Sequence, residues 1–193
     1  MTTTVPTGSV VVGVDGSASA SHALTWAAAH AHAEGRPLVL VHAGPTPAPA
    51  GTGWMEAAGV DHRRLCLVLK EDARALLSEA EVPVRAEYPE LEIHQLVRLG
   101  DARGVLLEAS AEARLLVVGT RGLGPLRHLL LGSVSTALVK HATCPVVVVR
   151  PAAAQGRAVL AGVAGEPADA AILDLAFRVA EARQLPLRVF HCF

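Results

Sequence analysis

Hydrophobic residues along the chain fall into short runs that alternate with longer stretches of helical character. The runs 9–14, 37–42, 115–118 and 146–149 are rich in valine and leucine, and turn residues bound them. Runs of this kind are typical of strands buried in a parallel sheet. The segment 91–98 alternates apolar and polar residues instead, which favours a strand nearer the sheet edge. The pattern therefore predicts five strands.

Helical stretches separate these strands. Residues 19–33 are rich in alanine and long enough for about four turns, and leucines near helical spacing predict a second helix around 61–80. Asp101 offers an N-cap for a helix over 102–113, and Ser133 offers one for a shorter fourth helix. The alternation predicts an α/β fold with an open parallel sheet and helices on both faces.

The end of the chain repeats its beginning. A shift of 149 places aligns 10–44 with 159–193 without a gap, and 11 of 35 positions match, including paired glycines, a proline and a histidine. We therefore predict a first domain over 1–150, a linker over 151–157, and the opening strand–helix–strand of a second, degenerate repeat over 158–193. So short a tail cannot close a core alone. It docks on the first domain, pairs with another chain, or belongs to a truncated chain.

Charge and composition exclude several classes of protein. The 17 basic and 18 acidic residues give a net charge of −1, which provides no electrostatic footprint for nucleic acid or an anionic membrane. No apolar run approaches the roughly 18 residues of a membrane span, and the first residues lack the basic region of a signal peptide. The three cysteines lack the spacing of a zinc site. We expect a cytoplasmic protein without a structural metal.

One glycine-containing segment carries candidate chemistry. Gly119, Gly122, Gly132 and Ser133 stand at the spacing G-x2-G-x9-G-S, directly after a buried strand and before a helix. Glycines allow positive φ and close approach to a ligand, and a helix N-terminus offers unpaired N–H groups to a phosphate. The alternative is an ordinary loop in which Ser133 is only a helix cap.

Asp15 is the second candidate. It stands where the first strand ends, so a central position of that strand would bring it and Gly119 to the two sides of the crevice in which open α/β sheets bind ligands. A carboxylate repels phosphate, which makes a ribose hydroxyl its natural partner. The alternative is a turn or helix-capping aspartate.

These motifs resemble the universal stress protein family, in its nucleotide-binding form. The resemblance covers 9–150, with GVDGS near the start, VHA after the second strand, and GTRGLGPLRHLLLGSVSTALVKHATCPVVVVRP at the end. It implies a five-stranded parallel sheet in the order 3-2-1-4-5 that binds ATP, with Mg²⁺, across the first and fourth strands. It also implies a homodimer formed through the edge strand Val146–Val149.

The resemblance further implies a role for each site residue. Asp15 would hold the ribose above Gly13 and Val14, the backbone of Ala43 would meet the adenine, and a glycine-rich set would surround the phosphates. Arg121 would neutralise phosphate charge, or would remain a solvated arginine. The full set of expected nucleotide-binding residues is Gly13, Val14, Asp15, Ala43, Val118, Gly119, Arg121, Gly122, Gly132, Ser133, Val134 and Ser135.

The second copy departs from this pattern. Ala164 stands where the first copy has Asp15, and no glycine loop follows, so we expect no nucleotide there. Trp54, after the Pro/Gly-rich loop 44–53, either covers the nucleotide or packs on the surface. His42 recurs as His191, which favours a structural hydrogen bond over catalysis.

The sequence lacks the motifs of several enzyme classes. It contains neither a lysine-bearing P-loop nor the GxSxG motif of a serine nucleophile, and no catalytic residue is predicted. The leading hypothesis is a regulatory ATP-binding protein of the stress response with at most slow hydrolysis. A dimerising, partner-binding scaffold with a vestigial nucleotide site is the alternative, and an ATP-consuming enzyme is a third.

Overall fold

The chain divides into two compact units, Met1–Arg150 and Pro151–Phe193. The computed structural model describes residues 4–47, 59, 61–120, 122, 131–150, 158–167 and 169–191. The predicted linker 151–157, Trp54 and residues 48–53 of the preceding loop lie outside these ranges.

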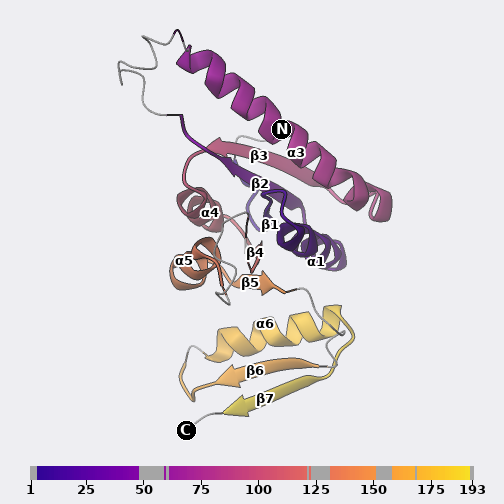
Figure 1. Cartoon of the computed structure of the whole chain (residues 1–193). Coiled ribbons are helices and arrows are strands. Elements are labelled where there is room, and N and C mark those ends of the chain that lie inside the picture. Colours follow the sequence, from indigo (N-terminus) through magenta and orange to yellow (C-terminus); the bar gives the residue numbers. More distant parts are fainter. Residues whose placement is uncertain are drawn as a thin grey trace. The chain divides into compact units, whose positions relative to one another are not determined.

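The first unit is built on a five-stranded parallel sheet (Figure 1). Its strands are β1 (Val10–Gly13), β2 (Leu38–Gly44), β3 (Ile93–Leu99), β4 (Leu115–Gly119) and β5 (Val146–Val149). The order β3-β2-β1-β4-β5 confirms the predicted fold class, with the alternating strand β3 at one edge and β5 at the other. In the central register, Val10 lies opposite Leu38 on one side and Leu115 on the other.

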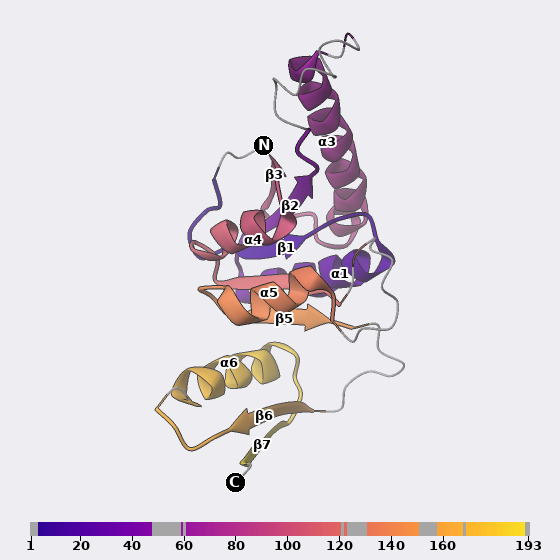
Figure 2. The same cartoon turned by 60° about the vertical axis from the view of Figure 1, so that its left-hand side comes forward.

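Helices cover both faces of this sheet. They are α1 (Ala18–Glu34), α3 (His62–Glu87), α4 (Ala102–Ser110) and α5 (Ser133–His141). Val10 and Val12 point toward α1 and α3, where Leu77 is fully buried, whereas Val11 packs with Leu106 of α4 and Leu138 of α5. The two views show α4 and α5 together on the face opposite α1 (Figures 1 and 2). Alternate strand residues thus supply two separate cores, as the pleat requires.

Two helices end at different residues from those predicted. Helix α3 begins after Asp61, whose carboxylate accepts from the backbone N–H of Arg63 at 2.9 Å, but it continues to Glu87 rather than ending near residue 80. It passes through Pro83, and Val84 beyond it is 4% exposed. Helix α4 ends at Ser110, not at residue 113. Core packing of Val84 offsets the backbone hydrogen bond that Pro83 removes.

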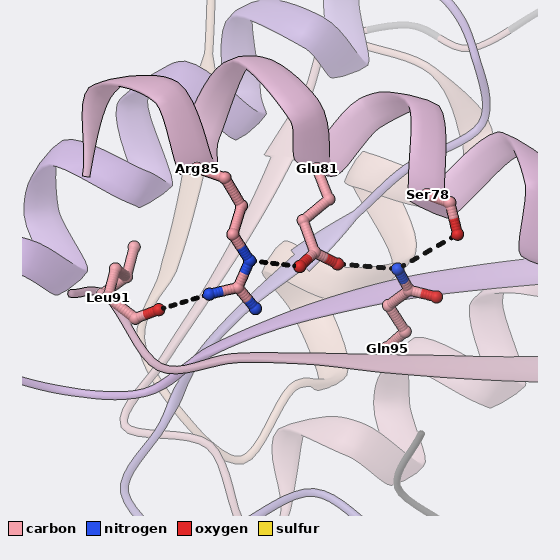
Figure 3. Close-up of polar contacts among 5 residues, drawn as sticks. All are labelled: Ser78, Glu81, Arg85, Leu91 and Gln95. Carbon is pink, nitrogen blue, oxygen red and sulfur yellow. Dashed lines mark hydrogen bonds and ion pairs between the residues drawn. The ribbon is translucent and has the colours of Figure 1, made fainter. Parts of the chain in front are cut away.

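A polar network joins α3 to β3 (Figure 3). The Glu81 carboxylate accepts from Arg85 Nε at 2.6 Å and from Gln95 Nε2 at 2.6 Å. Arg85 Nη1 also donates to the carbonyl of Leu91 at 3.2 Å, and Gln95 Nε2 lies 3.5 Å from Ser78 Oγ. Glu81 therefore holds the end of α3, the turn after it and β3 in one arrangement.

We expect Glu81→Ala to lower the free energy of unfolding by about 1–2 kcal/mol, because it removes two short hydrogen bonds from a side chain that is 16% exposed. The control is Glu71→Ala, at an exposed position of the same helix, where no side-chain hydrogen bond or ion pair is found within the described part of the chain. Urea denaturation measures both. Equal midpoints for the two variants would contradict the anchoring role of Glu81.

The second unit is a single strand–helix–strand. Strands β6 (Val159–Val163) and β7 (Leu187–His191) pair in parallel and are connected by α6 (Asp169–Ala182). Ala161 is buried, as are Ala176 and Ala180 of the helix. None of the described helices in either unit has the length and apolar character needed to cross a membrane.

Candidate functional site

The sheet order places a crevice between β1 and β4. After β1 the chain enters α1, on one face of the sheet. After β4 and the glycine segment it enters α5, on the other face. The carboxyl ends of β1 and β4 therefore form a topological switch point. A cavity of about 730 Å³ lies there. Its walls come from β1 and the turn after it, α1, β2, β4, α4 and α5. The lining contains eleven of the twelve residues predicted: Gly13, Val14, Asp15, Ala43, Val118, Gly119, Gly122, Gly132, Ser133, Val134 and Ser135. Arg121 lies outside the described residues.

Backbone and side-chain hydrogen bonds fix the turn that carries Asp15. Asp15 Oδ1 accepts from the backbone N–H of Ser17 at 3.0 Å, and Gly16 takes a φ of +81°, which an L side chain rarely adopts. The carbonyl of Val14 lies 2.7 Å from Nδ1 of His42, which donates to it. His42 therefore has the structural role that its recurrence predicts, and among the described residues no hydrogen bond is found for the second Asp15 oxygen.

Gly119 is required by close packing rather than by its φ. It is the last residue of β4 and is not among the glycines with positive φ. A Cβ on Gly119 would lie 2.7 Å from the backbone oxygen of Ser19 and against the Ser19 hydroxyl. The expectation of positive φ is therefore wrong at Gly119. The close approach found there is to α1, and the predicted close approach to a ligand stays a prediction.

Gly132, not Ser133, is the N-cap of α5. Gly132 has a φ of −75° and a ψ of 169°, its N–H donates to the carbonyl of Thr120 at 2.7 Å, and its own carbonyl accepts from Thr136 at 3.0 Å. Ser133 is the first helical residue and makes no side-chain cap. The first N–H groups of a helix have no partner within it, so α5 presents those of Ser133 and Val134 at the cavity wall.

Ser135 is tied to the protein itself. Ser135 is only 3% exposed, and its hydroxyl oxygen lies 3.1 Å from the carbonyl oxygen of Gly132 and 3.3 Å from that of Thr120. The single hydroxyl proton donates to these carbonyls, so Ser135 shapes the cavity wall and contributes its backbone N–H rather than a side-chain donor.

Gly122 lies against the Asp15 carboxylate. A Cβ on Gly122 would contact Asp15 Oδ2 closely enough that the aspartate would have to move. The glycine loop thus returns to the aspartate turn, and the absence of a side chain at Gly122 leaves Asp15 its position in the cavity.

Several lining residues were not predicted from the sequence. Ala102 and Leu106 of α4 add apolar wall, and Lys140 of α5 is the one basic residue in the described lining. Lys140 follows Ser133 by seven residues, about two helical turns, so the spacing 133, 136, 137, 140 on a single helix face was the available signal. It places a cation on the α5 wall of a cavity whose opposite side carries Asp15.

Comparison with known proteins gives the family. The model of the Universal stress protein family matches residues 7–150. The chain belongs to the universal stress protein family. A universal stress protein of Mycobacterium tuberculosis is 33% identical over 185 residues, which cover 95% of this chain and 64% of that protein. One from Mycobacterium bovis is 32% identical over 201 residues, 95% of this chain and 62% of the relative. The chain thus spans a little under two thirds of the length of these universal stress proteins.

The solved structure of a universal stress protein in complex with cAMP is similar to this chain, with a TM-score of 0.57 and 26% identity. The match covers 75% of this chain and 97% of that one. The fold and the family are therefore shown by independent comparisons, of sequence and of structure.

The second unit of this universal stress protein differs at the corresponding turn. The Asp169 carboxylate accepts from the backbone N–H groups of Ala164, Gly165 and Glu166 at 3.1, 2.7 and 2.8 Å. These bonds, above all that from Glu166, hold the pKa of Asp169 below its usual range. The amides after β6 are therefore engaged by the protein's own carboxylate.

Proposed function

We propose that this universal stress protein binds ATP, with Mg²⁺, in the cavity at the carboxyl ends of β1 and β4, and that it acts as a regulatory nucleotide-binding protein of the stress response. The observation that carries the proposal is the placement of helix N-terminal amides, for which no acceptor is found among the described residues, on one wall and of a fixed carboxylate on the other. Amides at a helix N-terminus suit phosphates, and a carboxylate suits ribose hydroxyls.

Each wall then has one role. Asp15 binds the ribose, the backbone of Ala43 at the end of β2 meets the adenine, and the α5 amides hold the phosphates. Lys140, on the α5 wall, adds positive charge toward the phosphates. Asp15 is the one carboxylate in the described lining. Mg²⁺ prefers six oxygen ligands, so the phosphate oxygens of the nucleotide would have to complete its coordination.

The geometry supports binding more than turnover. Within the described lining, the acidic and basic groups are Asp15 and Lys140 alone, and the proposed roles leave neither as a base that orients water for phosphoryl transfer. Bound nucleotide therefore stabilises one state of the protein, with at most slow hydrolysis. The related cAMP complex supports an adenine nucleotide as the ligand class.

A second candidate function rests on β5. This strand of four valines pairs with β4 on one side, is only partly buried, and forms the edge of the sheet in the described unit. An apolar edge is readily paired by another chain, so we also propose a homodimer through Val146–Val149, formed in the cytoplasm. If the nucleotide site is vestigial, this scaffold role remains.

The test is the melting temperature of the full chain with ATP, deoxyATP and no nucleotide. Ligand at a hundredfold excess over Kd should add about 2.7 kcal/mol of stability. We expect Asp15→Asn to weaken ATP binding and to remove the preference for ATP over deoxyATP, because the ribose hydroxyl loses its charged acceptor. A wild-type melting temperature that ATP leaves unchanged, together with a purified protein that carries no nucleotide by intact mass, would favour the scaffold.

A further inference from the structure

A second cavity of about 340 Å³ lies between α1 and α3. Its lining shares one residue, Val14, with the first cavity and otherwise consists of different residues. Glycine and apolar residues make up most of it, with four polar side chains. The lining is Val14, Gly16, Ser21, Leu24, Thr25, Ala28, Leu76, Glu79, Ala80, Pro83, Val84 and Glu87. We call this cavity the α1–α3 groove.

The floor of the α1–α3 groove is apolar. Leu24 and Ala28 of α1 are 4% and 1% exposed, and Val84 of α3 is 4% exposed. Leu76 packs against the turn after β1, where its Cδ1 would lie 3.3 Å from a Cβ on Gly16. The floor is therefore part of the packed core and is a surface for an alkyl chain rather than for a polar ligand.

The hydroxyl groups of the groove are turned into acceptors. Ser21 Oγ donates to the carbonyl of Ser17 at 3.3 Å, and Thr25 Oγ1 donates to the carbonyl of Ser21 at 3.2 Å. Each hydroxyl has one proton and two lone pairs. With the protons used along α1, both oxygens offer a ligand only acceptor capacity.

The groove also carries two carboxylates, those of Glu79 and Glu87. Glu81, two residues from Glu79, is engaged by Arg85 and Gln95 (Figure 3). In the described part of the chain, by contrast, no ion pair is found for Glu79 or Glu87, and Glu87 only accepts from the Tyr88 hydroxyl at 3.0 Å.

The backbone adds one more acceptor beside the groove. Pro83 has no N–H, so α3 leaves the carbonyl of Glu79 without its usual donor one turn later. None of the lining residues is basic. The described polar side chains of the α1–α3 groove thus offer acceptors above an apolar floor, and a complementary ligand supplies donors, positive charge and an apolar body.

We propose that the α1–α3 groove binds an elongated organic cation, an alkyl chain with an ammonium group at each end. Glu79 and Glu87 are eight residues apart on α3, which corresponds to about 12 Å along a helix. The two ammonium groups pair with these carboxylates, and the chain between them lies on Leu24, Ala80 and Val84. This site is independent of the proposed nucleotide.

The experiment is calorimetric titration of the full chain, without nucleotide, with octamethylenediamine, whose extended chain matches this separation. The proposal expects binding that weakens at least tenfold in the double variant Glu79→Gln, Glu87→Gln. The matched control Glu71→Gln removes an exposed carboxylate of α3 outside the groove and should bind as the wild type does. Unchanged circular dichroism and melting temperature establish that the double variant is folded.

Two further probes test the ligand class. Tetramethylenediamine cannot reach both carboxylates and should bind at least tenfold more weakly, and the neutral octamethylene glycol should not bind at all. The proposal is overturned if the wild type gives no binding heat at millimolar diamine, if the double variant binds as tightly as the wild type, or if the short diamine or the glycol matches the long diamine.

Discussion

Replacing Gly132 with Asp is expected to abolish nucleotide binding while leaving α5 intact. Gly132 is the N-cap of the helix, with φ of −75° and ψ of 169°, a conformation that Asp adopts readily and in which its carboxylate caps the free amides of the first turn. The substituted carboxylate would then occupy the donors proposed for phosphate and would repel the ligand. We expect the affinity for ATP to fall at least a hundredfold by calorimetry, with an unchanged or slightly higher melting temperature.

Gly132→Asn is the matched control, because asparagine also caps a helix but carries no charge. It should weaken ATP binding less than aspartate does, and the difference measures the repulsion between carboxylate and phosphate. ATP binding by Gly132→Asp at wild-type strength would remove the N-terminus of α5 from the site.

Gly119→Ala should cause the largest loss of stability among these variants. The added Cβ would lie 2.7 Å from the backbone oxygen of Ser19, and a backbone atom cannot swing aside as a side-chain tip can. The end of β4 and the start of α1 would have to separate, at a cost of about 2–3 kcal/mol. The free energy of unfolding in urea measures this.

Gly104→Ala is the contrasting control. Gly104 lies inside α4 with no atom within 4 Å of its hypothetical Cβ, and alanine is the better helix former, so stability should rise by about 0.5–1 kcal/mol. If the two alanine variants shifted the unfolding midpoint in the same direction, the close approach of Ser19 to Gly119 would not be the reason for the glycine.

Much of the fold could be predicted from local pattern. Runs of valine and leucine bounded by turn residues located the strands, and the alternating run 91–98 correctly indicated the edge strand β3. The strand order did not follow from periodicity and came only from the family resemblance, because pairing between distant strands leaves no local signal. Helix α3 was predicted too short because the leucines near helical spacing that predict it end at Leu77, and the burial of Val84 farther along the helix is a tertiary effect.

Most of the predicted site residues line one cavity, but the sequence did not always give the structural reason for the residue at each position. The spacing of Gly119, Gly122 and Gly132 brought these residues to one cavity, yet Gly119 is needed for packing against α1, and Gly132 caps the helix in place of Ser133. These reasons depend on which helix or strand packs against each glycine, and the local sequence pattern does not specify that packing. Lys140 was missed because the motif ends seven residues before it.

The face of α1 that packs on the sheet is made largely of alanine: Ala20, Ala23, Ala27 and Ala31 are each at most 4% exposed. An alanine side chain is a single methyl group, so nearly every substitution on this face adds side-chain volume. Any larger side chain would lift the helix from β4 and carry the turn that holds Asp15 with it. The identity of these small residues is thereby linked to the shape of a crevice that most of them never line.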